Sequence, residues 1–185
     1  MIIDINQQKI AIADKYRISV NGQEVYRAAR KLWRIFAEVD LFYRDEGEPR
    51  LTIKKRLSFF KPSYDIFVGG DAYRFTTRNF WKHVYLCDIG ADHYEVYAHR
   101  GRKYSIFCND RQVAWWDKDA VSVLAGDHYV ITADDDADAA VLVAFCLIID
   151  NYRSDEHDDK LVNYDVGNLL QAKKFDPYWQ PRSRK

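Results

Sequence analysis

One uninterrupted apolar stretch, Ala139–Ile149, constrains the fold of this 185-residue chain more than any other feature. A helix that is apolar on every side has to be buried on every side or lie in lipid. At 1.5 Å per residue this stretch spans about 16 Å, roughly half the hydrocarbon thickness of a bilayer, which argues against a membrane span. We therefore predict a buried core helix over residues 138–150, with Leu142, Phe145 and Leu147 among its core side chains.

A strand buried on both faces is the alternative structure for this stretch, and length alone barely separates the two. The preceding aspartates favour the helix, because Asp is a preferred N-cap residue and complements the positive end of the helix dipole. Asp134, Asp136 and Asp138 also have the spacing of the first three ligands of a calcium loop. However, Ala139 stands where that loop needs Gly, and Phe145 where it needs Glu. We therefore expect helix capping and no bound metal.

Before the aspartates the dominant hydrophobic period is two, which is typical of half-buried antiparallel strands. Leu51 and Ile53, for example, alternate with polar neighbours, and turn signals such as Asn21-Gly22 separate the segments. Counting between the turn signals predicts twelve short strands, at 9–12, 16–20, 24–29, 36–43, 50–56, 64–68, 72–77, 82–88, 93–98, 103–108, 112–117 and 128–133. These strands would supply the apolar sleeve that the helix requires, so the predicted fold is mainly β, a closed antiparallel barrel around the helix.

We divide the chain into a barrel domain at 1–152 and a polar tail at 153–185. The tail has one short amphipathic pattern around Val166 and Leu169, which favours a short docked helix. It also carries the acidic run 155–159, which is typical of a solvated surface.

An ordered set of short motifs resembles the LURP-one-related family, a relative of the tubby C-terminal domain and the phospholipid scramblases. The motifs are Lys15-Tyr-Arg-Ile-Ser-Val, Glu24-Val-Tyr-Arg-Ala, Leu51-Thr-Ile-Lys-Lys-Arg-Leu, Tyr64-Asp-Ile-Phe, Tyr104-Ser-Ile-Phe, Val113-Ala-Trp and Asp127-His-Tyr-Val-Ile, followed by the apolar stretch. The resemblance covers about residues 9–150. It implies a twelve-stranded barrel around a central hydrophobic helix and, in the tubby relatives, binding of phosphoinositide headgroups. Fold alone does not settle function.

Charge and cysteine usage limit the function classes. The 28 basic residues equal the 28 acidic ones, so no overall field draws the chain to nucleic acid, and no nucleic-acid partner is expected. Three cysteines without CxxC spacing argue against a disulfide framework and for a reducing, cytoplasmic location. The amino-terminal residues show no signal-peptide pattern, and no transmembrane segment is expected.

One cationic cluster is the candidate binding site for an anionic phospholipid: Arg50, Lys54, Arg56 and Lys61. Lys54 and Arg56 are expected to share the outward face of one strand, where they could receive a phosphate. A second basic group, made of Arg27, Arg30, Lys31 and Arg34, is a candidate extension. The alternative is an ordinary solvated strand face, which surface charge alone does not distinguish.

Catalytic motifs are lacking: the sequence has no GxSxG, no HExxH and no Gly-rich phosphate loop. His83, His93 and Cys87 match no zinc spacing, and no cofactor is expected. The leading hypothesis is a non-enzymatic domain that binds a phospholipid headgroup, a membrane surface or a protein partner. The alternatives are an interaction scaffold acting through residues 151–185 and, less favoured, a small enzyme or ligand carrier, since the helix would fill the lumen.

Overall fold

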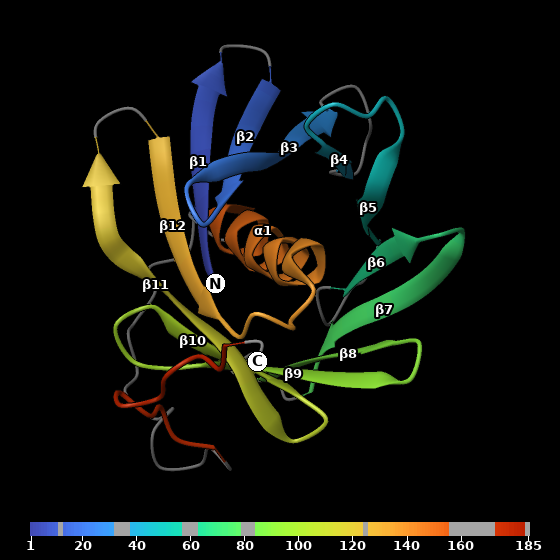
Figure 1. Cartoon of the computed structure of the whole chain (residues 1–185). Coiled ribbons are helices and arrows are strands. Elements are labelled where there is room, and N and C mark those ends of the chain that lie inside the picture. Colours follow the sequence, from blue (N-terminus) through green and yellow to red (C-terminus); the bar gives the residue numbers. More distant parts are fainter. Residues whose placement is uncertain are drawn as a thin grey trace.

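Twelve antiparallel strands close into a barrel around one helix in the computed structural model of the chain (Figure 1). The structure describes residues 1–10, 13–31, 38–56, 63–78, 84–123, 126–155 and 173–183, and this helix and these strands are those of the described ranges. Each strand pairs with its neighbours in sequence, and β1 pairs with β12 to close the ring. The predicted closed barrel with a central helix is therefore confirmed.

The strands are short, and tight turns join most of the pairs whose connections are described. Positive φ angles of 51° at Asn21 and 81° at Gly22 form the turn between β2 and β3, as Asn-Gly predicts. The strands are β1 (Ile2–Ile10), β2 (Ala13–Val20), β3 (Gln23–Lys31), β4 (Glu38–Tyr43), β5 (Pro49–Lys55), β6 (Ser63–Val68), β7 (Asp71–Thr77), β8 (Val84–Ile89), β9 (Asp92–Ala98), β10 (Lys103–Cys108), β11 (Arg111–Val123) and β12 (Gly126–Ala133).

Helix α1 (Ala139–Asp155) begins where the sequence predicts and lies inside the barrel (Figure 1). Leu142, Phe145 and Leu147 are at most 1% exposed, so the predicted core helix is confirmed. The Phe145 ring packs against Phe75 of β7 and Tyr94 of β9, at centroid distances of 5.2 and 5.4 Å. The helix continues past the end of the apolar stretch to Asp155, five residues beyond the expected end at residue 150.

One local prediction is wrong. The first strand was expected at 9–12 but covers Ile2–Ile10, where Ile3 and Ile5 face the core at 0% exposure. Glu38 and Asp40 of β4 are also covered, at only 4% and 5% exposure. Period-two alternation assigns a side chain to one face of a strand, but it does not reveal whether that face is covered.

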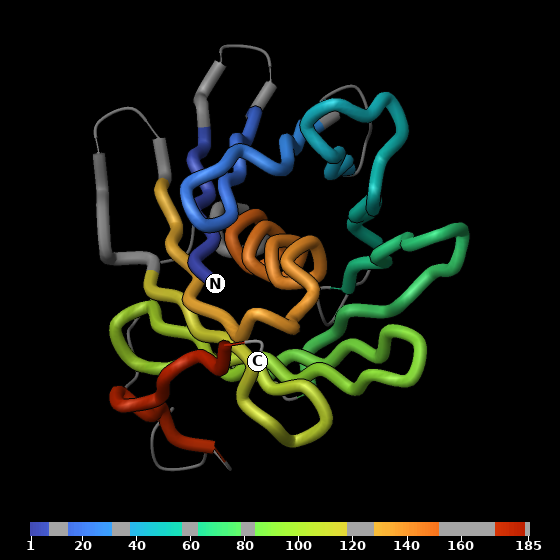
Figure 2. The backbone as a smooth tube through the Cα atoms, viewed as in Figure 1, coloured from blue at the N-terminus to red at the C-terminus, as the bar shows by residue number. Residues whose placement is uncertain are grey.

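The segment 173–183 returns to the outside of the barrel wall, and Figure 2 shows it beside the strands from β9 to β11. Its described residues form neither strand nor helix. The short tail helix expected near Val166 and Leu169 lies outside the described residues.

Candidate functional site

The expected cationic cluster is distributed over separate ion pairs. Arg50 Nη2 lies 3.3 Å from Asp138 Oδ2 at the amino-terminal end of α1. Lys54 Nζ lies 3.9 Å from Glu38 Oε2, and Arg56 Nη1 lies 2.8 Å from an oxygen of Asp65. Lys61 lies outside the residues that the structure describes. The three described members of the cluster therefore each have a carboxylate partner.

Strand register explains this pairing. Glu38, Lys54, Asp65 and Arg74 stand directly opposite one another across β4, β5, β6 and β7, so their charges alternate along one row. Arg74 Nε lies 2.7 Å from Asp65 Oδ1. Burial alone would raise the pKa of Asp65, but hydrogen bonds from Arg74 and Arg56 lower it below its usual value. An incoming anion would have to compete with carboxylates already in place.

A different basic surface lies on the outside of β2, β3 and β4. Here a shallow hollow of about 490 Å³, which we call the basic groove, is lined by Lys15, Tyr16, Arg17, Glu24, Arg27, Ala28, Ala29 and Phe42. The alternation of β2 creates its charge, because Tyr16 and Ile18 are buried at 2% and 0% exposure while Lys15 and Arg17 are exposed.

Two arginines of the basic groove are direct cross-strand neighbours. Arg17 of β2 stands opposite Arg27 of β3, and Arg27 in turn stands opposite Phe42 of β4. Arg27 Nη2 donates a hydrogen bond of 3.2 Å to the carbonyl of Glu46, and its guanidinium carbon lies 5.6 Å from the Phe42 ring centroid. Arg27 is thus held in place by contacts in which no carboxylate of the described residues takes part.

Three basic side chains of the basic groove have no ion-pair partner among the described residues. Among the described residues no carboxylate lies within ion-pair distance of Lys15, Arg17 or Arg27, and Glu24 is the one acidic residue of the lining. Like charges directly opposite on adjacent strands destabilise a sheet. An anion between the two guanidinium groups would relieve that repulsion and accept their hydrogen bonds.

Sequence reasoning found Arg27 as a candidate extension of the other cluster and used Lys15 and Arg17 only as part of a family motif. The available signal was two cations at alternate positions of a strand, Lys15-Tyr-Arg17. Arg30 has an interaction of its own and is not in the described lining of the groove, and the structure does not describe the side chain of Lys31 or any part of Arg34. The strand register was needed to bring Arg17 and Arg27 together.

The three aspartates with calcium-loop spacing contact three different arginines. Asp138 caps α1 by accepting a 2.9 Å hydrogen bond from the Ala140 amide, as predicted. Asp138 pairs with Arg50, and Asp136 Oδ2 lies 3.3 Å from Arg111 Nη2. The third carboxylate, that of Asp134, is fully buried and pairs with Arg182.

The strand face that carries Tyr85 and Cys87 points into the core. Tyr85 and Cys87 are 3% and 2% exposed, and His83 lies outside the described residues. Burial raises the pKa of the Cys87 thiol to about 12, which leaves it protonated and inert at neutral pH. In the described part of the chain, no three His, Cys, Asp or Glu side chains are grouped as a metal site would require.

Comparison with known proteins adds one finding. A family model described as LURP-one-related matches residues 1–150. No curated protein and no solved structure matches the chain. No helix in the described ranges has the length and apolar character needed to cross a membrane.

Proposed function

Because the chain belongs to the LURP-one-related family, we propose that it is a non-enzymatic binding domain whose basic groove receives a phosphate-bearing headgroup at an anionic membrane surface. The observation that carries this proposal is the Arg17–Arg27 cross-strand pair, which faces the groove without a carboxylate partner among the described residues. The family itself does not fix the ligand.

The ligand class follows from the lining. Two guanidinium groups and the Lys15 ammonium match a phosphate, because Arg offers forked donors and Lys a mobile point charge. The small side chain of Ala29 and the ring of Phe42 supply apolar contact beside these charges. A phosphate on an amphiphilic molecule satisfies both parts of the lining.

The position of the core helix favours binding over catalysis. Helix α1 occupies the centre of the barrel, where a small barrel would otherwise hold a ligand. The basic groove is a hollow on the outer wall, and the part of its lining that the structure describes contains no nucleophile beside a general base. We therefore propose recognition without chemistry at this surface.

Vesicle flotation tests the proposal. The protein is mixed with phosphatidylcholine vesicles that contain or lack a phosphatidylinositol phosphate, and the bound fraction is measured. Each basic residue near an anionic surface contributes about 1 kcal/mol, so Arg17→Ala/Arg27→Ala should weaken binding to the anionic vesicles by about thirtyfold. Binding should also fall with rising salt, because the attraction is electrostatic.

The ion-paired cluster provides the matched control. Lys54→Ala/Arg56→Ala removes the same number of positive charges, but each of these cations already has a carboxylate partner: Glu38 for Lys54, and Asp65, which Arg74 shares, for Arg56. This control should change vesicle binding by less than about threefold, since exposed ion pairs contribute little. Equal losses in the two variants, or no binding by the wild type, would contradict the groove as the site. Binding of inorganic phosphate by the wild type but not by Arg17→Ala/Arg27→Ala, without vesicle binding, would show that the ligand is a free phosphate compound.

A further inference from the structure

The segment 173–183 lies beyond the residues matched by the family model and covers the outer face of β9, β10 and β11 (Figure 2). Three side chains of this segment, those of Lys173, Phe175 and Arg182, contact the barrel wall. Between them lie exposed residues, including Tyr178 at 89% exposure. The segment is therefore attached at separate points and is not part of the core.

The first attachment point is a lysine on an acidic and aromatic surface. Lys173 Nζ donates hydrogen bonds of 2.6 Å to Glu95 and 2.9 Å to Asp110. It also lies 4.4 Å from the ring centroid of Phe107, within cation–π range. Although burial opposes the charge, the hydrogen bonds from Lys173 to Glu95 and Asp110 raise the pKa of the ammonium. This site selects a cation.

The second attachment point is an aromatic contact between Phe175 and two rings of the barrel wall. The ring of Phe175 meets Trp115 edge-on at 5.7 Å and lies 5.4 Å from the His99 ring. Lys103 Nζ stands 5.3 Å from the same ring. Phe175 therefore has two aromatic neighbours and a cation within cation–π distance, which are contacts suited to an aromatic side chain.

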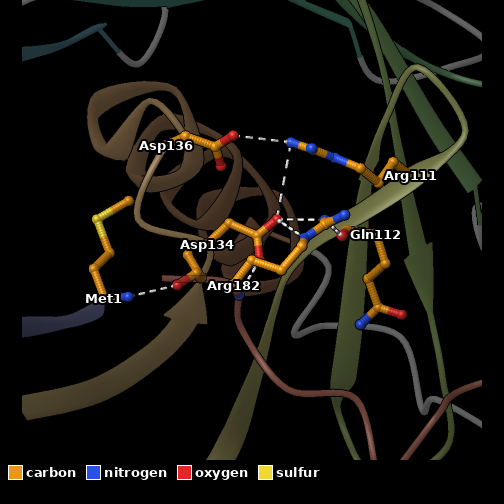
Figure 3. A network of polar contacts seen from close by, with 7 residues as sticks. Met1, Arg111, Gln112, Asp134, Asp136 and Arg182 are labelled. Carbon is orange, nitrogen blue, oxygen red and sulfur yellow. Dashed lines mark hydrogen bonds and ion pairs between the residues drawn. The ribbon is translucent and has the colours of Figure 1, made fainter. Parts of the chain in front are cut away.

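The third attachment point is a buried carboxylate at the end of the barrel where α1 begins (Figure 3). The guanidinium of Arg182 contacts Asp134, which is 0% exposed, and donates a 2.7 Å hydrogen bond to the carbonyl of Gln112. The main chain contributes as well, since the Arg182 amide donates to Asp134 and the Asp135 amide donates to the Arg182 carbonyl.

The barrel alone gives the Asp134 carboxylate only a distant cationic partner. The nearest barrel cation in the described ranges is Arg111, whose Nη2 lies 3.9 Å from Asp134 Oδ2. A buried carboxylate is costly unless a cation with good geometry compensates it. The forked contact from Arg182 supplies that compensation. A fully buried acid that receives its best partner from a surface segment has the character of a recognition site for a basic side chain.

We propose that the outer face of β9–β11 is a peptide-recognition surface, which holds residues 173–183 of this chain as an exchangeable resident ligand. Its specificity is for a peptide that carries Lys and Phe two positions apart, followed by an Arg. When the resident segment detaches, the surface is open to a partner peptide of the same chemistry. This inference is independent of the basic groove on β2–β4.

Fluorescence anisotropy with a labelled peptide of residues 173–183 tests the proposal on the full-length chain. A tethered segment competes at an effective concentration of about 1 mM, so the wild type should bind the added peptide weakly. In Phe175→Ala/Arg182→Ala the resident segment is released, and the peptide should bind at least about tenfold more tightly than to the wild type. A peptide with the same two substitutions should bind neither protein.

Lys174 and Gln180 provide the matched control, because both are exposed and no barrel contact is described for either. Lys174→Ala/Gln180→Ala should bind the peptide as weakly as the wild type does. No gain in the released variant would overturn the proposal, because the segment would then be a fixed part of the fold. Should the double variant lose its cooperative thermal transition, Phe175→Ala alone carries the comparison, and the absence of a gain there is equally decisive. A wild-type dimer that the double variant abolishes would support the surface, with a second copy as its occupant.

Discussion

Replacing Phe145 with Ala should test most directly whether the core helix holds the barrel together. The side chain is 0% exposed and packs on Phe75 of β7 and Tyr94 of β9, the two strands that flank β8. Truncating a buried Phe to Ala typically costs about 3–5 kcal/mol, because the cavity adds to the lost transfer free energy. For a chain of this size, about 4 kcal/mol lowers the thermal midpoint by about 8–16 °C.

Urea unfolding followed by circular dichroism measures this effect. The denaturation midpoint of Phe145→Ala should fall while the slope with urea stays the same, because the surface exposed on unfolding hardly changes. Tyr178→Ala is the control, since that aromatic ring is 89% exposed and its loss should cost less than about 0.5 kcal/mol. A loss below about 1 kcal/mol for Phe145→Ala, similar to the control, would refute the tight packing of α1 inside the barrel.

Two further predictions concern charge. Leu147→Asp places an unpaired carboxylate at a fully buried position, so the cooperative thermal transition should disappear; a transition near the wild-type temperature would contradict this. For Asp65, the folded pKa lies below its ordinary value of 3.8, so the stabilisation from its ion pairs is present above that pH and is lost as the pH falls through the folded pKa. The difference in thermal midpoint between the wild type and Asp65→Asn should therefore shrink below about pH 4, and a constant difference would argue against the ion pairs.

The sequence predicted the architecture because the two patterns that define it, an all-apolar stretch and period-two alternation, are local properties of the chain. The all-apolar stretch 139–149 can be satisfied only by burial on every side, and alternating strands are the element that curls into a sleeve. The N-cap at Asp138 was likewise readable, since capping joins residues two and three positions apart. The first strand was placed too late, at 9–12, although Ile3 and Ile5 flank a polar residue, because no turn signal precedes it.

The candidate site was only partly readable. Alternation correctly placed Lys54 and Arg56 away from the core, but it could not reveal the carboxylates beside them. Lys54 meets Glu38 from the preceding strand, and Arg56 meets Asp65 from the following one. The opposite error concerns Arg17, which the sequence did not single out as a binding residue. Its importance depends on Arg27, which stands opposite it on the neighbouring strand.

The sequence by itself determined which side chains face the core and that one helix must be enclosed, because both follow from spacing along the chain. Only the tertiary structure decided which charged side chains form ion pairs and which remain available to bind a ligand. Arg17 faces Arg27 through the register of two strands, and Asp134 meets Arg182 across 48 residues of sequence. An electrostatic site depends on distances of a few ångströms between distant segments, and those distances exist only after the strands have closed around the helix.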